Sequence, residues 1–156
     1  MTSPSEVLSC LAGKTLATAE SCTGGLIGAM LTAVPGSSAV YKGGVVSYCN
    51  EIKHCLLGVP EALLERYGAV SAPVAEAMAM GAARSLDTDV AVSVTGLAGP
   101  GGDEFGNPVG RVYIGYWDVN GAVSREFTFQ GDREAVRQQA ADAALNYILE
   151  KQKKRP

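Results

Sequence analysis

The chain has 156 residues, 47% of them hydrophobic, so it can bury one sizeable core but is too short for two ordinary domains. We therefore predict a single domain that spans residues 1–156. Its formal net charge of −3 and its pI near 5.1 argue against a nucleic-acid-binding protein, because affinity for phosphate backbones depends on clustered Lys and Arg.

Apolar spacing and glycine or proline boundaries predict the elements of the first half of the chain. In order, these are a helix over residues 7–11 that ends at Gly13, a strand over 15–19, a helix over 26–34, a strand over 40–48, and short helices over 51–57 and 60–67. Gly58 and Gly68 close the two short helices, as glycine commonly does. Strands therefore alternate with helices in this half.

The second half begins with a predicted helix that Ser71 caps and that carries Pro73 in its first turn. A nearly continuous apolar strand over 89–95 follows, then a glycine-rich loop over 96–108, which we interpret as a ligand-covering loop. Strands over 111–119 and 122–129 are joined at Asn120-Gly121, a two-residue hairpin signal. This order of elements predicts a mixed sheet between helices.

The last predicted helix starts near Asp132 and ends in the basic residues between Lys151 and Arg155, where the helix dipole favours cations. The polar residues 1–6 lack the basic and apolar regions of a signal peptide, and no apolar run reaches membrane-spanning length. We expect a cytoplasmic protein that does not bind membranes.

The four cysteines show neither a Cys-x-x-Cys pair nor the spacing of a disulfide framework, so we expect free thiols: they are Cys10, Cys22, Cys49 and Cys55. Asp103 and Glu104 lack the ligand spacing of a calcium loop, and His54 is the only histidine. We therefore expect neither a metal nor a cofactor.

A lysine and a tyrosine follow the strand over 40–48, and they are the first candidates for chemistry. Tyr48 and Lys53 are predicted near the carboxyl end of that strand, where open α/β sheets tend to bind ligands. A desolvated lysine acts as a general base if its pKa falls to about 7 or 8. The alternative is a sheet-edge aromatic beside a solvated lysine.

Two serine-bearing turns precede Lys53. Ser21, Thr23 and Gly24 lie where a strand gives way to a helix, so they either cap the helix or offer amides to a phosphate or carboxylate. Ser38 lies in a turn before the next strand, which by itself is ordinary turn chemistry. Spacing alone leaves open which serine faces the lysine.

Two further residues are candidates for ligand contact. Thr95 ends the long apolar strand, so its hydroxyl is expected at the same edge of the sheet. Arg133, at the start of the last helix, would lower the pKa of a nearby lysine, grip a phosphate or pair with a surface carboxylate. The sequence does not separate these roles.

Six motifs in this order resemble the CinA carboxy-terminal-domain family, whose stand-alone members are nicotinamide-nucleotide amidohydrolases. They are Ala19-Glu20-Ser21-Cys22-Thr23-Gly24-Gly25, Gly36-Ser37-Ser38, Tyr48-Cys49-Asn50-Glu51-Ile52-Lys53, Gly68-Ala69-Val70-Ser71, Thr95-Gly96-Leu97-Ala98-Gly99-Pro100 with Pro108-Val109-Gly110, and Gly131-Asp132-Arg133. The resemblance covers about residues 5–151. Cys49 stands where serine is common in the family, and Ile52 where alanine is.

The resemblance implies a three-layer α/β/α fold with a mixed sheet and a homodimer or larger homo-oligomer. It also implies deamidation of nicotinamide mononucleotide to nicotinate mononucleotide and ammonia, a step of pyridine nucleotide salvage. In this sequence the nucleophile would be Ser38, the general base Lys53, and the proton-relaying hydroxyl Tyr48. Ser21, Thr23, Gly24 and Thr95 would line the site, and Arg133 would contact the nucleotide.

Two alternatives remain beside this hypothesis. Some family members are known mainly as competence or damage-inducible proteins, so the pocket would bind a nucleotide without chemistry. In the second alternative, the protein is an amidase for a different small amide.

Overall fold

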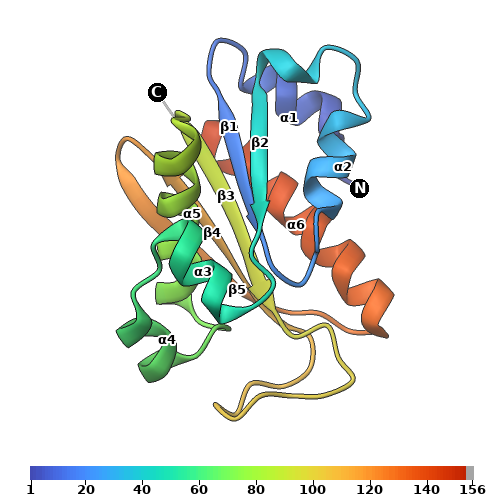
Figure 1. The fold of residues 1–156 in the computed structure, drawn as a ribbon. Helices are drawn as coiled ribbons and strands as arrows, with labels where there is room; N and C mark the ends of the chain where they lie inside the picture. The colour runs from blue at the N-terminus through green and yellow to red at the C-terminus, as the bar shows by residue number, and fades with distance from the viewer. Residues whose placement is uncertain (154–156) are drawn as a thin grey trace.

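The computed structural model describes residues 1–153, which form a mixed sheet with helices on both faces (Figure 1). The strands are β1 (Leu16–Glu20), β2 (Tyr41–Val46), β3 (Val90–Gly96), β4 (Arg111–Asp118) and β5 (Gly121–Thr128), in the order β2-β1-β3-β4-β5. β1 pairs in parallel with β2 and with β3, whereas β3, β4 and β5 pair antiparallel. The predicted mixed sheet is confirmed.

Two groups of helices complete three layers. The helices are α1 (Pro4–Cys10), α2 (Leu26–Thr32), α3 (Asn50–Leu57), α4 (Glu61–Tyr67), α5 (Ala72–Leu86) and α6 (Arg133–Lys153), with a short 3-10 helix, η1 (Ser37–Ala39). Figure 1 shows α1, α2 and α6 on one face of the sheet and α3, α4 and α5 on the other. The expected three-layer α/β/α architecture is therefore present.

Each face of the sheet has its own hydrophobic core. Leu16 points into the core shared with α1, α2 and α6, whereas its neighbour Ala17 belongs to the core beneath α5. This alternation is the period-2 geometry of a strand, and it leaves all of β1 buried. Because β1 and β3 are covered on both faces, their ends are fixed in space, and these ends carry the candidate site.

α3 and α5 pack backbone against backbone. A Cβ atom added at Gly81 of α5 would overlap the backbone carbonyl of Leu57 in α3. Glycine at this position therefore allows the two helices to approach closely. The contact fixes α3, the helix that carries Lys53.

Two local predictions need correction. Asp118 pairs with Gly121, so the hairpin loop is Val119-Asn120 rather than Asn120-Gly121; the Asp118 carboxylate accepts the Asn120 amide hydrogen and forms a turn one residue earlier. Ser71 is the residue before α5, but its hydroxyl donates to the Gly68 carbonyl, and it makes no cap hydrogen bond.

The chain end and the cysteines follow the predictions as far as they are described. Lys151 and Lys153 lie in the last turn of α6, whereas residues 154–156, with the rest of the predicted basic end, lie outside the described residues. All four cysteines are free thiols. Within residues 1–153, no helix has both the length and the apolar character needed to span a bilayer.

Candidate functional site

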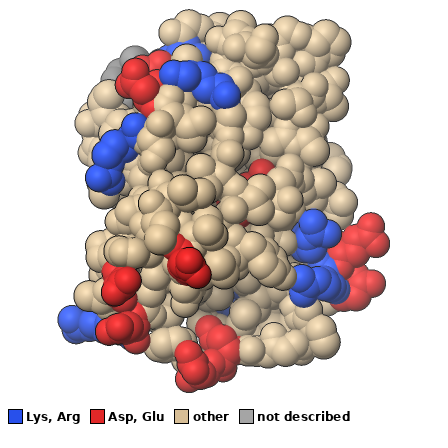
Figure 2. All heavy atoms as spheres, viewed as in Figure 1, with Lys and Arg blue, Asp and Glu red and all other residues tan. Residues whose placement is uncertain are grey.

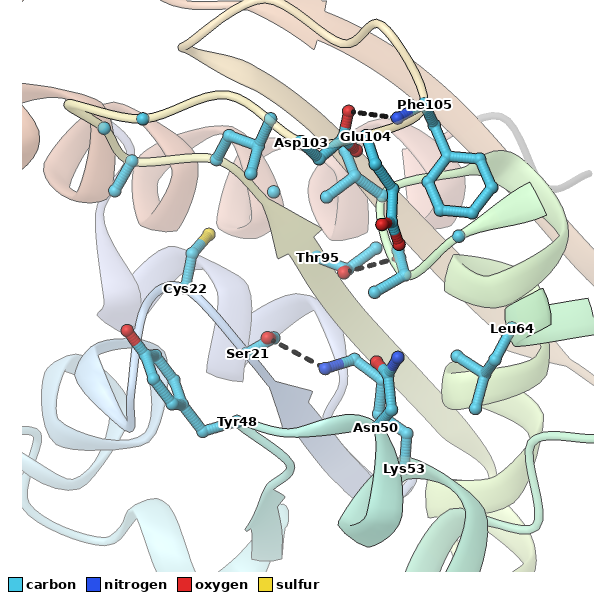
Figure 3. A pocket seen from close by; sticks show the side chains of 18 of the residues that line it. Ser21, Cys22, Tyr48, Asn50, Lys53, Leu64, Thr95, Asp103, Glu104 and Phe105 are labelled. Carbon is cyan, nitrogen blue, oxygen red and sulfur yellow. Dashed lines mark hydrogen bonds between the residues drawn. The ribbon is translucent and has the colours of Figure 1, made fainter. Parts of the chain in front are cut away.

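Lys53 is a buried amine with two hydrogen-bond partners. Its side chain is 1% exposed, and its Nζ donates to Ser21 Oγ at 3.1 Å (Figure 3) and to the Ser47 carbonyl at 2.8 Å. Ser21 directly follows β1 and Ser47 directly follows β2. Because the two strands are parallel, their carboxyl ends meet at one edge of the sheet, and α3 turns back to place Lys53 there.

Burial changes the acidity of this amine. It lowers the pKa of Lys53 from 10.5 to about 8, while the nearby Cys49 and Cys22 groups act in the opposite direction. Burial alone therefore supplies the shift, without the cation that the sequence suggested at Arg133. About a tenth of the amine is then neutral at pH 7, ready to accept a proton.

A cavity of about 490 Å³, called here the site cavity, opens beside Lys53. It lies at the carboxyl ends of β1 and β3 and beneath the loop that follows β3. Its lining includes five of the predicted site residues: Ser21, Tyr48, Lys53, Thr95 and Arg133. Residues of the glycine-rich loop after β3 also line it.

Arg133 connects three segments at the entrance of the cavity. Its Nη1 donates to the Gly99 carbonyl at 2.7 Å, and its Nη2 donates to Tyr48 Oη at 3.0 Å. Tyr48 is 62% exposed, so its hydroxyl stands at the rim beside Arg133 rather than at Lys53. Figure 3 shows the Tyr48 ring on the opposite side of Ser21 from Asn50.

Thr95 lies deeper in the cavity wall. It is buried, and its hydroxyl donates to the Ala69 carbonyl at 2.8 Å. That hydrogen bond ties the end of β3 to the segment before α5. The Thr95 hydroxyl still has lone pairs with which to accept a hydrogen bond from a ligand.

The predicted anion site at the start of α2 is already occupied by a side chain of the protein. The Glu20 carboxylate accepts hydrogen bonds from the Thr23 hydroxyl at 2.7 Å and from the amides of Gly25, Ile27 and Gly28. The Gly24 amide donates to the Ser21 carbonyl. Glu20 therefore neutralises the helix start, and neither Thr23 nor Gly24 is among the residues that line the site cavity.

Ser38 is not brought to Lys53 within this chain. It lies in η1, which precedes β2, and its side chain is exposed. Lys53 follows the opposite end of β2, a strand of six residues that spans about 20 Å. The lysine faces Ser21, the other serine that the sequence left open.

Cys22 borders the site cavity but offers no reactive thiolate. Burial raises the pKa of the Cys22 thiol to about 11, so it stays protonated and unreactive near neutrality. The residues that the structure describes contain no group of three or more His, Cys, Asp or Glu side chains placed to hold a metal ion.

A family model described as the CinA C-terminal domain matches residues 5–152. The chain belongs to this family. A CinA-like protein from Thermosynechococcus vestitus is 59% identical over 121 residues, which are 77% of this chain and 29% of that protein. One from Desulfotalea psychrophila is 51% identical over 136 residues, 87% of this chain and 33% of that protein.

The chain spans about a third of the length of these curated CinA-like relatives. Solved structures of the superfamily match it over nearly its whole length. Competence damage-inducible protein A from Klebsiella pneumoniae has a TM-score of 0.92 at 33% identity and covers 98% of this chain and 99% of its own. CihA from Agrobacterium tumefaciens has a TM-score of 0.90 at 38% identity, with coverages of 94% and 92%.

One residue of this CinA domain that the sequence analysis missed holds the turn after β1. Arg137 donates from Nε to the Cys22 carbonyl at 3.0 Å and from Nη2 to the Thr23 carbonyl at 3.1 Å. With Glu20 on the other side, it fixes the segment that carries Ser21. The signal was present: Arg137 follows Arg133 by four residues, which places both on one face of α6.

Proposed function

We propose that the chain hydrolyses the amide of nicotinamide mononucleotide to nicotinate mononucleotide and ammonia, with Lys53 as general base and Ser21 as nucleophile. The observation that carries the proposal is the buried Lys53 Nζ at 3.1 Å from Ser21 Oγ in the site cavity. A hydroxyl within hydrogen-bond reach of an amine of lowered pKa is the arrangement that activates a serine without histidine. The resemblance to nicotinamide-nucleotide amidohydrolases suggests the substrate.

The reaction then proceeds in two steps. Neutral Lys53 takes the proton of Ser21 while Oγ forms a bond to the carboxamide carbon, and the C–N bond breaks as the Lys53 ammonium returns the proton to the leaving ammonia. In the second step Lys53 takes a proton from water. The resulting hydroxide attacks the ester carbon and breaks the bond to Oγ, Ser21 recovers its proton from Lys53, and the carboxylic acid product loses its proton to solvent to give the carboxylate.

Ser21 takes the role first predicted for Ser38. It is buried and contacts the lysine, whereas Ser38 lies at the other end of β2. Since proton transfer needs heavy atoms within about 3 Å, only the first arrangement serves the reaction within one chain.

Arg133 is the group that we assign to the substrate phosphate. Each terminal guanidinium nitrogen carries two hydrogens, and one on each is used by Gly99 and Tyr48. The remaining donors and the positive charge suit a phosphate oxygen at the rim of the cavity. Tyr48 then orients the guanidinium instead of relaying a proton.

A matched pair of serine variants tests the proposal. Ammonia released from nicotinamide mononucleotide is measured for the unaltered chain, for Ser21→Ala and for Ser38→Ala. Loss of an activated nucleophile typically lowers turnover by about 10³-fold or more, so Ser21→Ala should be inactive while Ser38→Ala stays within about twofold. The same change at the two positions controls for general effects of losing a hydroxyl. Full activity of Ser21→Ala would overturn the assignment.

The second candidate is a nucleotide-binding module without chemistry. Relatives named as competence or damage-inducible proteins favour it, because those names state no reaction. Binding of the mononucleotide without ammonia release would support this reading. Release of ammonia from other small amides, but not from the mononucleotide, would instead indicate an amidase of different specificity.

A further inference from the structure

The two ends of the site cavity carry opposite charges. Arg133 stands at the rim with Tyr48 and Gly99, whereas the loop after β3 contributes Asp103 and Glu104 to the lining. Figure 3 shows Tyr48 on one side of Ser21, and Glu104 and Phe105 on the other. The reacting pair, Ser21 and Lys53, lies between the guanidinium and the carboxylates.

The two carboxylates of the loop differ in their availability. Asp103 accepts hydrogen bonds from the Phe105 amide at 3.1 Å, the Asn107 amide at 3.0 Å and Asn107 Nδ2 at 2.8 Å. Burial raises the pKa of Asp103, but these hydrogen bonds lower it by more, so the net pKa lies below its usual value. Asp103 is therefore ionised and is part of the loop's own structure. Among residues 1–153, Glu104 has no hydrogen bond or ion pair, so its carboxylate is available to a ligand.

The surroundings of Glu104 reinforce its negative charge. A second cavity of about 560 Å³ adjoins the site cavity and shares its lining at Asn50, Leu64, Glu104 and Phe105. Three further glutamates line this second cavity: Glu51, Glu61 and Glu65. Figure 2 shows acidic side chains gathered over this lower part of the molecule, around α3 and α4. Anionic groups are therefore disfavoured on this side, and cationic groups are favoured.

We propose that Glu104 recognises the positive charge of an N-substituted pyridinium ring, so that the site prefers a cationic ring to a neutral dihydropyridine ring of the same size. The inference rests on the proposed function for the identity of the ligand. A ligand with its phosphate at Arg133 and its carboxamide at Ser21 places its ring between the two ends of the cavity. The ring charge is then displaced from the phosphate toward Glu104, which lies across the reacting pair, so the polarity of the zwitterion matches the polarity of the site.

The test uses two ligands that differ in ring charge: nicotinamide mononucleotide and its reduced form. Their dissociation constants are measured by calorimetry at low ionic strength on Ser21→Ala, which prevents turnover, with and without Glu104→Gln. Because an exposed charge pair contributes little, Glu104→Gln should weaken the oxidised ligand about threefold to fivefold. The reduced ligand should change less than about 1.5-fold, and the difference should shrink as salt is added.

Glu65→Gln is the matched control, because Glu65 lines only the second cavity and the variant changes net charge by the same amount. It should leave the preference between the two ligands unchanged. Equal weakening of both ligands by Glu104→Gln, or no weakening of either, would overturn the role of Glu104.

The two proposals fail separately. If the chain releases no ammonia but Glu104 still favours the oxidised over the reduced ligand, the proposed hydrolysis is wrong and the proposed recognition of ring charge stands. If the chain hydrolyses the oxidised ligand but Glu104→Gln does not change the preference between the two ligands, the hydrolysis stands and the role of Glu104 is wrong. A chain that binds neither form would overturn both proposals.

Discussion

At the scale of the single residue, Lys53 shows how an environment changes the chemistry of a side chain. Its amine keeps only two hydrogen-bond partners, a hydroxyl and a carbonyl, where water would satisfy three N–H donors. No carboxylate contact compensates the charge among the described residues. The charged form is therefore disfavoured, and the neutral form that catalysis needs becomes accessible near physiological pH.

The pH dependence of turnover follows from this pKa. If Lys53 must be neutral to accept the Ser21 proton, kcat/KM should rise about tenfold per pH unit below the pKa and level off above about 8. Initial rates of ammonia release between about pH 6 and about pH 9.5 provide the profile. A rate that stays constant across this range would show that no group of this pKa acts as the base.

At the scale of the element, the position of Lys53 depends on how α3 packs on α5. The helices touch through Gly81, where an added Cβ would overlap the Leu57 carbonyl. Leu57 lies four residues after Lys53, so one helix carries both the contact and the base. Displacement of α3 therefore changes the distance between Lys53 Nζ and Ser21 Oγ.

We expect Gly81→Ala to destabilise the protein although alanine is the better helix former. The gain in helix propensity is about 1 kcal/mol, but overpacking against a backbone carbonyl costs about 1–3 kcal/mol and moves α3. Thermal unfolding should show a lower Tm, and ammonia release should fall with it. Met80→Ala, a change at the exposed neighbour, is the control and should alter neither. An unchanged Tm for Gly81→Ala would contradict the close packing.

At the scale of the whole molecule, the site is placed where the sheet's buried strands end. The two cores hold β1 and β3 from both faces, so the loops at their carboxyl ends start from fixed positions. A buried amine at this edge is tolerated because the cores supply the stability that its desolvation removes. Function and stability therefore oppose each other at Lys53.

We expect Lys53→Met to be inactive and more stable than the unaltered chain at pH 7. A Lys pKa lowered from 10.5 to about 8 means that the unfolded chain binds more protons between these values, so stability rises with pH there. Below pH 8 the native state carries the full cost of burying the charged amine, about 3 kcal/mol. Lys53→Met removes this cost but also loses the hydrogen bonds of Lys53, which reduces its gain in stability by about 1–2 kcal/mol.

Urea unfolding at several pH values measures this difference. The advantage of Lys53→Met should be about 1–2 kcal/mol at pH 7, should vanish between about pH 9 and about pH 10, and should reverse nearer pH 10.5, because the unaltered chain then keeps the hydrogen bonds of Lys53 without the desolvation penalty. Lys42→Met, a change at an exposed lysine, controls for loss of surface charge. A Lys53→Met variant less stable than the unaltered chain at pH 7 would contradict the penalty.

The sequence by itself predicted the main helices and strands and a mixed sheet between helices, because apolar periodicity and glycine or proline boundaries act over a few residues. The buried pattern of residues 90–95, for example, reflects burial on both faces of β3. It also indicated Tyr48, Lys53 and Thr95 as residues of one sheet edge, and Arg133 as a candidate neighbour of Lys53. The sequence did not predict the two residues of the hairpin loop or the hydrogen-bond partner of the Ser71 hydroxyl. In both places a side chain can hydrogen-bond to more than one nearby backbone group, and local sequence does not decide which.

Only the tertiary structure decided which serine meets the lysine. Ser21 follows its strand and Ser38 precedes its own, so parallel pairing of β1 with β2 sends the two serines to opposite edges of the sheet. It likewise decided that Glu20, and not a ligand, fills the start of α2. Both outcomes depend on strand direction and on contacts between distant segments, and local spacing along a chain carries no information about either.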